Sequence, residues 1–209
     1  MSNKCIMIDL ETTGISPDTE DLLQIGMLEM TFVENHWVGG RTLNIMQHSN
    51  REPETAFARK HMVEMYKRAN ETPYITPQLI RAQIINFAQT CSMAPPDIKF
   101  MGWNAGIFDI PFLVAKGILE PSVYKQVGDK EIRVGDFHYR IYDITGALEF
   151  MKNLLGTDSI DDIKKMFEHL EGRHIAELPA GKAHDAIYDC VSQMNFLNDL
   201  LLLAKQTWA

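Results

Sequence analysis

The sequence lacks the features of a membrane-spanning or secreted protein. No apolar run approaches the roughly 20 residues that a helix needs to cross a bilayer. The N-terminus carries no basic stretch, apolar run and small-residue cleavage site in the order of a secretory signal. Cysteine is scarce, and Cys5, Cys91 and Cys190 lie in apolar or helical settings that favour reduced core thiols. We therefore expect a cytoplasmic protein without a membrane partner.

Basic residues are outnumbered, with 20 lysines and arginines against 28 acidic residues and a net charge of −8. Proteins that grip long duplexes through many phosphate contacts are basic, so this balance argues against that class of nucleic-acid binder. It is compatible with an enzyme that contacts few nucleotides. Two bound divalent cations would change the net charge from −8 to −4 and place the added charge where a phosphate would bind.

The sequence also has no internal repeat, low-complexity tract or interdomain linker. Its 209 residues, 45% hydrophobic and 23% charged, have the length and composition of one globular domain with a sizeable core. We therefore expect residues 1–209 to form a single domain.

Hydrophobic patterning predicts strands first and a mixture of strands and helices afterwards. The stretch 4–14 begins as a buried strand, and strands over 22–33 and 37–46 complete an antiparallel meander. Downstream we expect, in chain order, helices at 53–69 and 77–91, a strand at 98–102, a helix at 108–116, a loop or small hairpin at 120–137, a strand at 138–144, helices at 145–155 and 158–170, a loop at 172–181 and a helix at 183–205. This order predicts an α/β fold with a mixed sheet flanked by helices.

Two carboxylates end the first predicted strand, in the stretch KCIMIDLETTG. Side chains alternate along a strand, so Asp9 and Glu11 are expected to point to the same face. Adjacent carboxylates in a buried setting repel and resist ionising together. A divalent cation such as Mg²⁺, which takes oxygen ligands, would remove that conflict. The alternative is a solvated strand end with two acids of no special role, and the pair alone favours that alternative.

Two further segments carry acids close to predicted helix starts. Asp109 follows the strand at 98–102, and alone it is better explained as an acid that the helix dipole favours. His184 and Asp189 are separated by roughly 140° on an ideal helix, so they cannot share one helix face. His184 is therefore expected at or before the first turn, which suits a proton-transferring histidine beside a fixed metal ligand. A surface histidine and a solvated acid are the alternatives.

In chain order, these segments resemble the three motifs of the DEDD exonucleases, in the subgroup with histidine as the fifth residue. The motifs here are Asp9-x-Glu11 followed by Thr12-Thr13-Gly14, then Asn104-x-x-x-Phe108-Asp109, then His184-x-Ala186-x-x-Asp189. The resemblance spans residues 6–195. It implies a ribonuclease H-like fold, with a five-stranded mixed sheet whose first three strands are antiparallel, and a 3′→5′ exonuclease activity.

The resemblance also implies a catalytic role for each of the five chemical positions. Asp9, Glu11 and Asp189 would hold one Mg²⁺ or Mn²⁺, and Asp9 with Asp109, directly or through water, would hold a second. In such sites one ion lowers the pKa of the attacking water and the other stabilises the leaving oxygen. His184 would accept the proton of that water, since histidine titrates near neutral pH. The product would be a nucleoside 5′-monophosphate released from the 3′ end.

Substrate-binding residues are implied within the first two motifs. The backbone at Leu10, Thr12 and Thr13 would meet the terminal sugar. Asn104 belongs to the second motif, and Phe108 resembles an aromatic wedge against the terminal bases. A core phenylalanine at a helix start is the equal alternative for Phe108.

Two softer matches concern histidine and arginine side chains. The segment 56–61 resembles one that brings a histidine, here His61, to the rim of the active site, with a histidine on an amphipathic helix as the equal alternative. The segment 138–143 resembles one of the oligoribonuclease branch that caps the substrate phosphate across a homodimer, here through His138 and Arg140. It follows a longer insertion than that branch carries, and an exposed strand-end cation is the alternative for Arg140.

The sequence thus predicts a metal-dependent 3′→5′ exonuclease that acts on single-stranded nucleic acid ends, with DNA slightly favoured over RNA. The alternative within the family is an oligoribonuclease or 3′→5′ exoribonuclease, for which a homodimer is the expected partner. A binding module of the same fold that has lost catalysis is disfavoured, because all five chemical positions are filled. The remaining alternative is an unrelated α/β metalloprotein with chance carboxylates.

Overall fold

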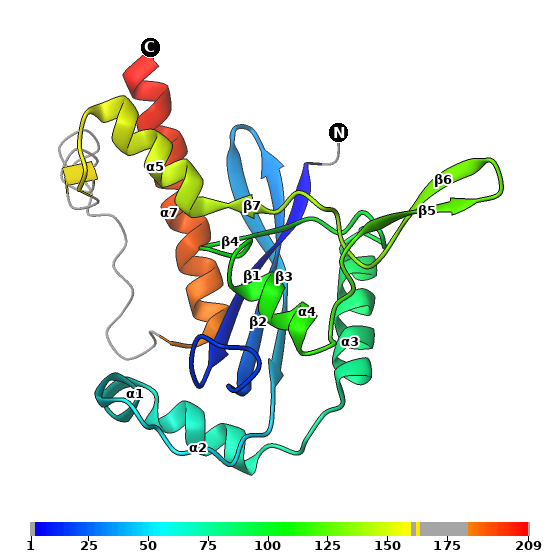
Figure 1. The fold of residues 1–209 in the computed structure, drawn as a ribbon. Coiled ribbons are helices and arrows are strands. Elements are labelled where there is room, and N and C mark those ends of the chain that lie inside the picture. Colours follow the sequence, from blue (N-terminus) through cyan, green and yellow to red (C-terminus); the bar gives the residue numbers. More distant parts are fainter. Residues whose placement is uncertain (1–2, 160–161, 164–183, 209) are drawn as a thin grey trace.

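A mixed five-stranded sheet forms the centre of the computed structural model, which describes residues 3–159, 162–163 and 184–208 (Figure 1). Its strands, in their order across the sheet, are β3 (His36–Met46), β2 (Leu22–Val33), β1 (Lys4–Thr12), β4 (Phe100–Gly102) and β7 (Tyr142–Asp143). β2 is antiparallel to both β1 and β3, while β4 is parallel to both β1 and β7. The predicted mixed sheet that begins as an antiparallel meander is therefore confirmed.

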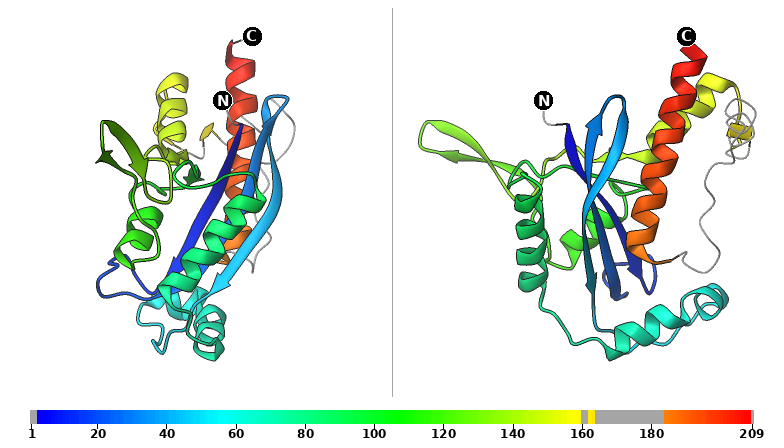
Figure 2. Two further views of the ribbon diagram at one scale, coloured as in Figure 1. Left: turned by 90° about the vertical axis from the view of Figure 1, so that its right-hand side faces the viewer. Right: turned by 180° about the vertical axis from the view of Figure 1, so that it is seen from behind.

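Helices cover both faces of this sheet (Figure 2). On one face, α3 (Pro77–Thr90) and α4 (Asp109–Ala115) bury their apolar side chains against β1 and β2 in the larger core cluster. On the other face, α7 (Ala186–Trp208) packs across β1, β2 and β3, and α5 (Ile144–Leu155) packs against its C-terminal half. This arrangement leaves β1 between two layers of helices.

Local sequence signals explain several helix boundaries. Thr76 caps α3, since its side chain accepts a hydrogen bond from the backbone N–H of Leu79, and Pro77 occupies the first turn. The helix predicted over 53–69 is two helices, α1 (Ala56–His61) and α2 (Val63–Glu71), because the chain leaves helical geometry between them. Both helices lie at the end of the sheet where β1 finishes (Figure 1).

The strand predicted over 138–144 is wrong for most of its length. Only the two residues of β7 pair with β4. Before β7 the chain bends, and the backbone N–H of Arg140 donates to Nδ1 of His138 at 3.0 Å. After it, Asp143 caps α5 by accepting a hydrogen bond from the backbone N–H of Thr145 at 3.0 Å. The segment 120–137 forms the small hairpin that was one of its two predicted structures, with strands β5 (Val123–Val127) and β6 (Lys130–Val134). The loop predicted at 172–181 and most of the helix predicted at 158–170 lie outside the described residues.

The predicted core thiols are confirmed, since Cys5, Cys91 and Cys190 are all buried and free. Each lies in or beside a core cluster between the sheet and a helix. None of the helices in the described ranges combines the length and apolar character that crossing a lipid bilayer requires.

Candidate active site

Two rows of side chains leave β1 in opposite directions. The odd-numbered row begins with Cys5 and Met7, which pack with Cys190 of α7, whereas the even-numbered side chains pack against α3 and α4. Asp9 and Glu11 continue the odd-numbered row. Both carboxylates therefore face the start of α7, and the prediction that they share one face of the strand is confirmed.

Residues of β2 fix the place where α7 begins. The backbone N–H of Ala186, the first residue of α7, donates to Oε1 of the buried Gln24 at 3.0 Å, which satisfies one of the free donors of the helix start. Gly26 allows a close approach, because a Cβ here would lie 2.3 Å from the carbonyl carbon of Ala186. Neither Gln24 nor Gly26 was predicted from the sequence, although a glycine inside a strand signals close backbone approach.

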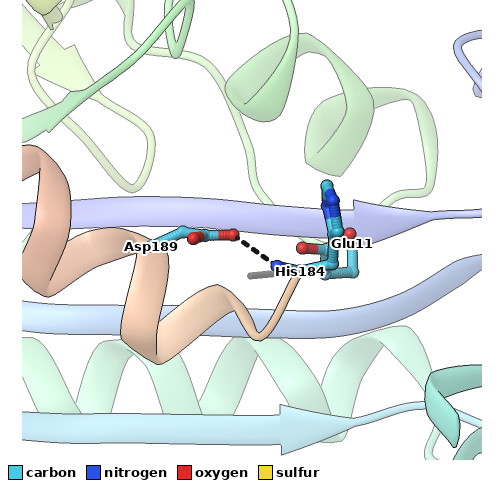
Figure 3. A group of neighbouring side chains, drawn as sticks. All are labelled: Glu11, His184 and Asp189. Carbon is cyan, nitrogen blue, oxygen red and sulfur yellow. Dashed lines mark hydrogen bonds between the residues drawn. The ribbon is translucent and has the colours of Figure 1, made fainter. Parts of the chain in front are cut away.

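His184 lies just before α7, in a left-handed backbone conformation with a φ of 67°. Its backbone N–H donates to Oδ2 of Asp189 at 3.2 Å, so this carboxylate holds the segment that carries the histidine (Figure 3). Glu11, His184 and Asp189 each offer one ligand atom, and these atoms lie within 4.8 Å of one another. The prediction that His184 precedes the helix, with Asp189 inside it, is confirmed.

The fourth carboxylate comes from α4, on the opposite layer of the fold. Asp109 is the first residue of this helix and is only 3% exposed. Its carboxylate accepts a hydrogen bond from the backbone N–H of Leu10 and repels that of Asp9. Asp143 holds the turn before α4, since it accepts a hydrogen bond from the backbone N–H of Asn104 at 3.2 Å. The structure therefore brings all four predicted acids to the end of β1.

Burial is the main cause that raises the pKa of all four carboxyl groups, and repulsion from neighbouring carboxylates adds to it. Burial, followed by repulsion from Asp189, raises the pKa of Glu11 to about 8. Burial is also the main cause that raises the pKa of Asp109 to about 7. Burial and then the three other carboxylates raise the pKa of Asp9, and burial raises the pKa of Asp189. Each group therefore resists carrying its charge when no cation is bound.

The donor set fits a hard divalent cation. Among the described residues, the largest influences on these four carboxyl groups include no lysine or arginine. Their negative charge is therefore relieved by protons or by a bound cation. Carboxylate oxygens, with an imidazole nitrogen close by, are suitable ligands for Mg²⁺ or Mn²⁺.

Between about pH 5 and about pH 8, the metal-free protein is expected to lose stability as the pH rises. Glu11 and Asp109 have folded-state pKa values of about 8 and about 7, against unfolded values near 4. In this range the folded state holds more protons than the unfolded state, so the free energy of unfolding decreases, by on the order of a few kcal/mol. Thermal unfolding in EDTA measures the decrease, and saturating Mg²⁺ should remove it. A melting temperature that increases over this range in EDTA would contradict the expectation.

An aromatic group on α1 lies against His184. The ring centroids of Phe57 and His184 are 4.9 Å apart in an edge-to-face arrangement, and those of His61 and His184 are 6.1 Å apart. The structure thus brings His61 close to the candidate base, and its role in substrate binding stays a prediction. Phe57 is 52% exposed. No role was predicted for Phe57 from the sequence, although its spacing from His61 places both side chains on one side of the helix.

Internal contacts hold the residues that were predicted to meet the terminal sugar. Leu10 is buried in the core, and its backbone N–H is directed at Asp109. The Thr12 hydroxyl donates to the carbonyl oxygen of Gly14 at 2.7 Å, and the Thr13 hydroxyl donates to a carboxylate oxygen in the turn after β1 at 2.6 Å. These hydrogen bonds hold the turn in place, and the contact of its backbone with a terminal sugar stays a prediction.

Asn104 and Phe108 lie in the turn before α4. Asn104 adopts a left-handed conformation with a φ of 57°. The Phe108 ring is half-buried and lies 5.7 Å from the ring of Phe112, at the edge of the larger core cluster. The core alternative for Phe108 therefore describes part of its surface, and contact with a substrate base stays a prediction for the rest.

His138 and Arg140 are not brought to the carboxylates. The backbone N–H of His138 donates to the carbonyl oxygen of Ile98, just before β4 begins. The four acids lie at the opposite end of β4, past Gly102. Arg140 is exposed, with its guanidinium 5.4 Å from the centre of the Tyr139 ring. Within one chain, the structure therefore agrees with the exposed-cation alternative for Arg140.

Comparisons with known proteins add no assignment. A scan against protein-family models finds no match for the chain, and a search of curated proteins finds none either. The geometry of the site therefore carries the functional proposal.

Proposed function

We propose that the protein is a metal-dependent 3′→5′ exonuclease of the DEDD family, with a ribonuclease H-like fold. The observation that carries the proposal is the convergence of four buried or half-buried carboxylates from three distant segments of the chain. Asp9 and Glu11 come from β1, Asp109 from α4 and Asp189 from α7. His184 completes the set, with a ligand atom within 4.8 Å of those on Glu11 and Asp189.

The proposed cofactors are two divalent cations, Mg²⁺ or Mn²⁺. Asp9, Glu11 and Asp189 would hold one, and Asp9 with Asp109 would hold the other. When bound, such ions supply the Lewis acids that phosphodiester hydrolysis needs at the attacking and leaving oxygens. The raised pKa values of these carboxyl groups support the choice, because positive charge would relieve their repulsion.

His184 is proposed to accept the proton of the attacking water. Its backbone is tied to Asp189 and its ring lies against Phe57, so the imidazole is held at the edge of the carboxylate cluster. Histidine titrates near neutral pH, which suits a general base. Its position before the helix, in contact with an exposed side chain, also leaves a route for the proton to solvent.

Exposed apolar side chains support a single-stranded substrate. Phe57 is 52% exposed beside His184, and Ile107 is 77% exposed two residues before Asp109. Unpaired bases stack on aromatic rings with little sequence preference. We therefore propose that unpaired terminal bases lie against these side chains. The slight preference for DNA over RNA stays a separate expectation, which the substrate panel below tests.

A substrate panel tests the activity. 5′-Labelled single-stranded DNA, single-stranded RNA and a dinucleotide are offered side by side with Mn²⁺, and a ladder that shortens from the 3′ end with release of nucleoside 5′-monophosphates is expected. Cleavage of the dinucleotide alone would favour the oligoribonuclease alternative, with its homodimer. Saturable binding without cleavage would favour the inactive binding module. If the protein neither bound nor cleaved any of these substrates, the proposal would be contradicted.

His184→Ala is expected to slow cleavage while metal affinity is largely kept. General-base catalysis contributes roughly 10²–10⁴-fold, so the single-turnover rate should fall within that range. Electron paramagnetic resonance of Mn²⁺ measures binding independently of the rate. His36→Ala changes an exposed histidine at the start of β3, at the other end of the sheet from the carboxylates, and should leave both quantities unchanged. If Mn²⁺ binding disappeared in His184→Ala, the residue would be a ligand and its proposed role as a base would be wrong.

The compartment we propose is the reducing cytoplasm. The three cysteines are buried free thiols, which is the usual state of cysteine in that environment. Treatment with a mild oxidant should therefore leave the fold without a disulfide between them.

A further inference from the structure

Gln193 joins α7 to two other parts of the site. It lies one helical turn after Asp189. Its Nε2 donates to Oδ1 of Asp9 at 2.7 Å, and its Oε1 accepts a hydrogen bond from the backbone N–H of Trp103 at 2.9 Å. A single side chain therefore contacts both a carboxylate of β1 and the backbone that follows β4.

The two partners fix the orientation of the Gln193 amide. The backbone N–H of Trp103 can only donate, so the amide oxygen of Gln193 must face it and the amide nitrogen faces Asp9. If the amide were flipped, its NH₂ group would face the backbone N–H of Trp103 and its oxygen would face the carboxylate of Asp9. Both hydrogen bonds would then be lost. The contact at Oδ1 therefore restrains the rotation of the Asp9 carboxylate, and its second oxygen is left for other ligands.

The Trp103 contact extends this restraint to the turn that leads to α4. The next residue, Asn104, is in the left-handed conformation, and its backbone N–H donates to Asp143 at 3.2 Å. The turn ends at Asp109, the first residue of α4. Gln193 and Asp143 thus fix this turn from its two sides, and the turn sets where the Asp109 carboxylate lies relative to Asp9.

Asn198 shows that α7 can be attached to the sheet without touching a carboxylate. On the same helix, its Oδ1 accepts from the backbone N–H of Trp37 at 2.7 Å and its Nδ2 donates to the carbonyl oxygen of Trp37 at 2.9 Å. Both bonds go to the backbone of β3. Attachment of the helix is therefore a role that Asn198 and Gln193 share, whereas contact with Asp9 is specific to Gln193.

We propose that Gln193 is a positioning residue for the metal centre: it holds Asp9 in the rotamer that receives the cations and couples that carboxylate to the turn carrying Asn104 and Asp109. This inference rests on the proposed function. It adds a residue outside the acids and the histidine of the three motifs, and it requires no contact between Gln193 and the substrate.

Gln193→Met tests the proposal with the full-length chain, since methionine matches the length of glutamine but cannot make either hydrogen bond. Loss of an outer-sphere partner typically costs about 10–100-fold in metal affinity or activity, so Mn²⁺ affinity and kcat should each fall by that factor. KM for a single-stranded oligonucleotide should change little, because Gln193 does not reach the substrate. Electron paramagnetic resonance of Mn²⁺ measures the affinity, and steady-state cleavage measures kcat and KM.

Asn198→Leu is the matched control. It removes an attachment of α7 that touches no carboxylate, and it should lower the melting temperature while leaving Mn²⁺ affinity unchanged. Gln193→Glu is a second variant that keeps the acceptor for Trp103, and it should also lower kcat because it sets a carboxylate against Asp9. Wild-type affinity and kcat in both Gln193 variants, or an equal loss of Mn²⁺ affinity in Asn198→Leu, would overturn the inference with the proposed function intact. A wild-type protein that binds no Mn²⁺ would overturn both.

Discussion

Replacing Asp9 by asparagine is expected to abolish metal-dependent cleavage and, at the same time, to stabilise the metal-free protein. Burial and the three neighbouring carboxylates raise the pKa of Asp9, so its charge opposes folding at neutral pH when no cation is bound. Asparagine keeps the shape and an oxygen that accepts the hydrogen bond from Gln193. It is a poor substitute for an anionic ligand, so the rate should fall by more than the roughly 100-fold that loss of an outer-sphere partner costs.

Thermal unfolding in EDTA and single-turnover cleavage with Mn²⁺ measure these two effects on the same preparations. Asp18→Asn removes one charge from an exposed position of the turn after β1 and should change neither quantity. Cleavage that persists in a pure Asp9→Asn sample would contradict the assignment of the site. A lower melting temperature in EDTA would contradict the account of its electrostatics.

Gly26→Ala is expected to reduce stability and activity together. The added methyl group would lie 2.3 Å from the carbonyl carbon of Ala186 and 2.6 Å from the backbone nitrogen of Ile187, and backbone atoms cannot rotate away. Overpacking of this kind typically costs about 1–3 kcal/mol. The start of α7 must move off β2, which would break its hydrogen bond to Gln24 and carry Asp189 away from Glu11.

Gly39→Ala is the matched control for this substitution. Gly39 also lies in the sheet beneath α7, but the nearest atoms to an added Cβ belong to the side chains of Met194 and Leu28, at 3.2 Å and 3.3 Å. Flexible side chains can yield by a few tenths of an ångström, so the fold and the cleavage rate should be largely kept. Full activity and unchanged stability in Gly26→Ala would show that the close contact between the start of α7 and β2 does not set the positions of the carboxylates.

The parts of the fold that sequence predicted well are those with strong local signals. The meander followed from three apolar segments separated by turns, and the start of α3 followed from Thr76 and Pro77. The strand at 138–144 failed because two side chains bond to the backbone locally: His138 accepts from the N–H of Arg140 before β7, and Asp143 ends β7 by capping α5. The break between α1 and α2 was missed because the apolar spacing continues through it.

The five chemical positions of the site were predicted because three short motifs, in chain order, resemble those of one family. Taken singly, the pair Asp9 and Glu11 and the lone Asp109 favoured alternatives with no catalytic role. The residues that align these motifs could not be found in the same way. The hydrogen bonds of Gln193 to Asp9 and of Ala186 to Gln24 join residues that are separated by most of the sequence. Only Gly26 left a local signal, a glycine within an apolar strand.

The central claim, that four converging carboxylates form a site for divalent cations, is tested most directly by Mn²⁺ binding near neutral pH, followed by electron paramagnetic resonance. The wild-type protein is predicted to bind Mn²⁺ saturably, and Asp9→Asn and Asp189→Asn are predicted to bind it much more weakly. His184→Ala should bind nearly as the wild type does. A wild-type protein that does not bind Mn²⁺, or binding that both carboxylate variants retain in full, would contradict the account.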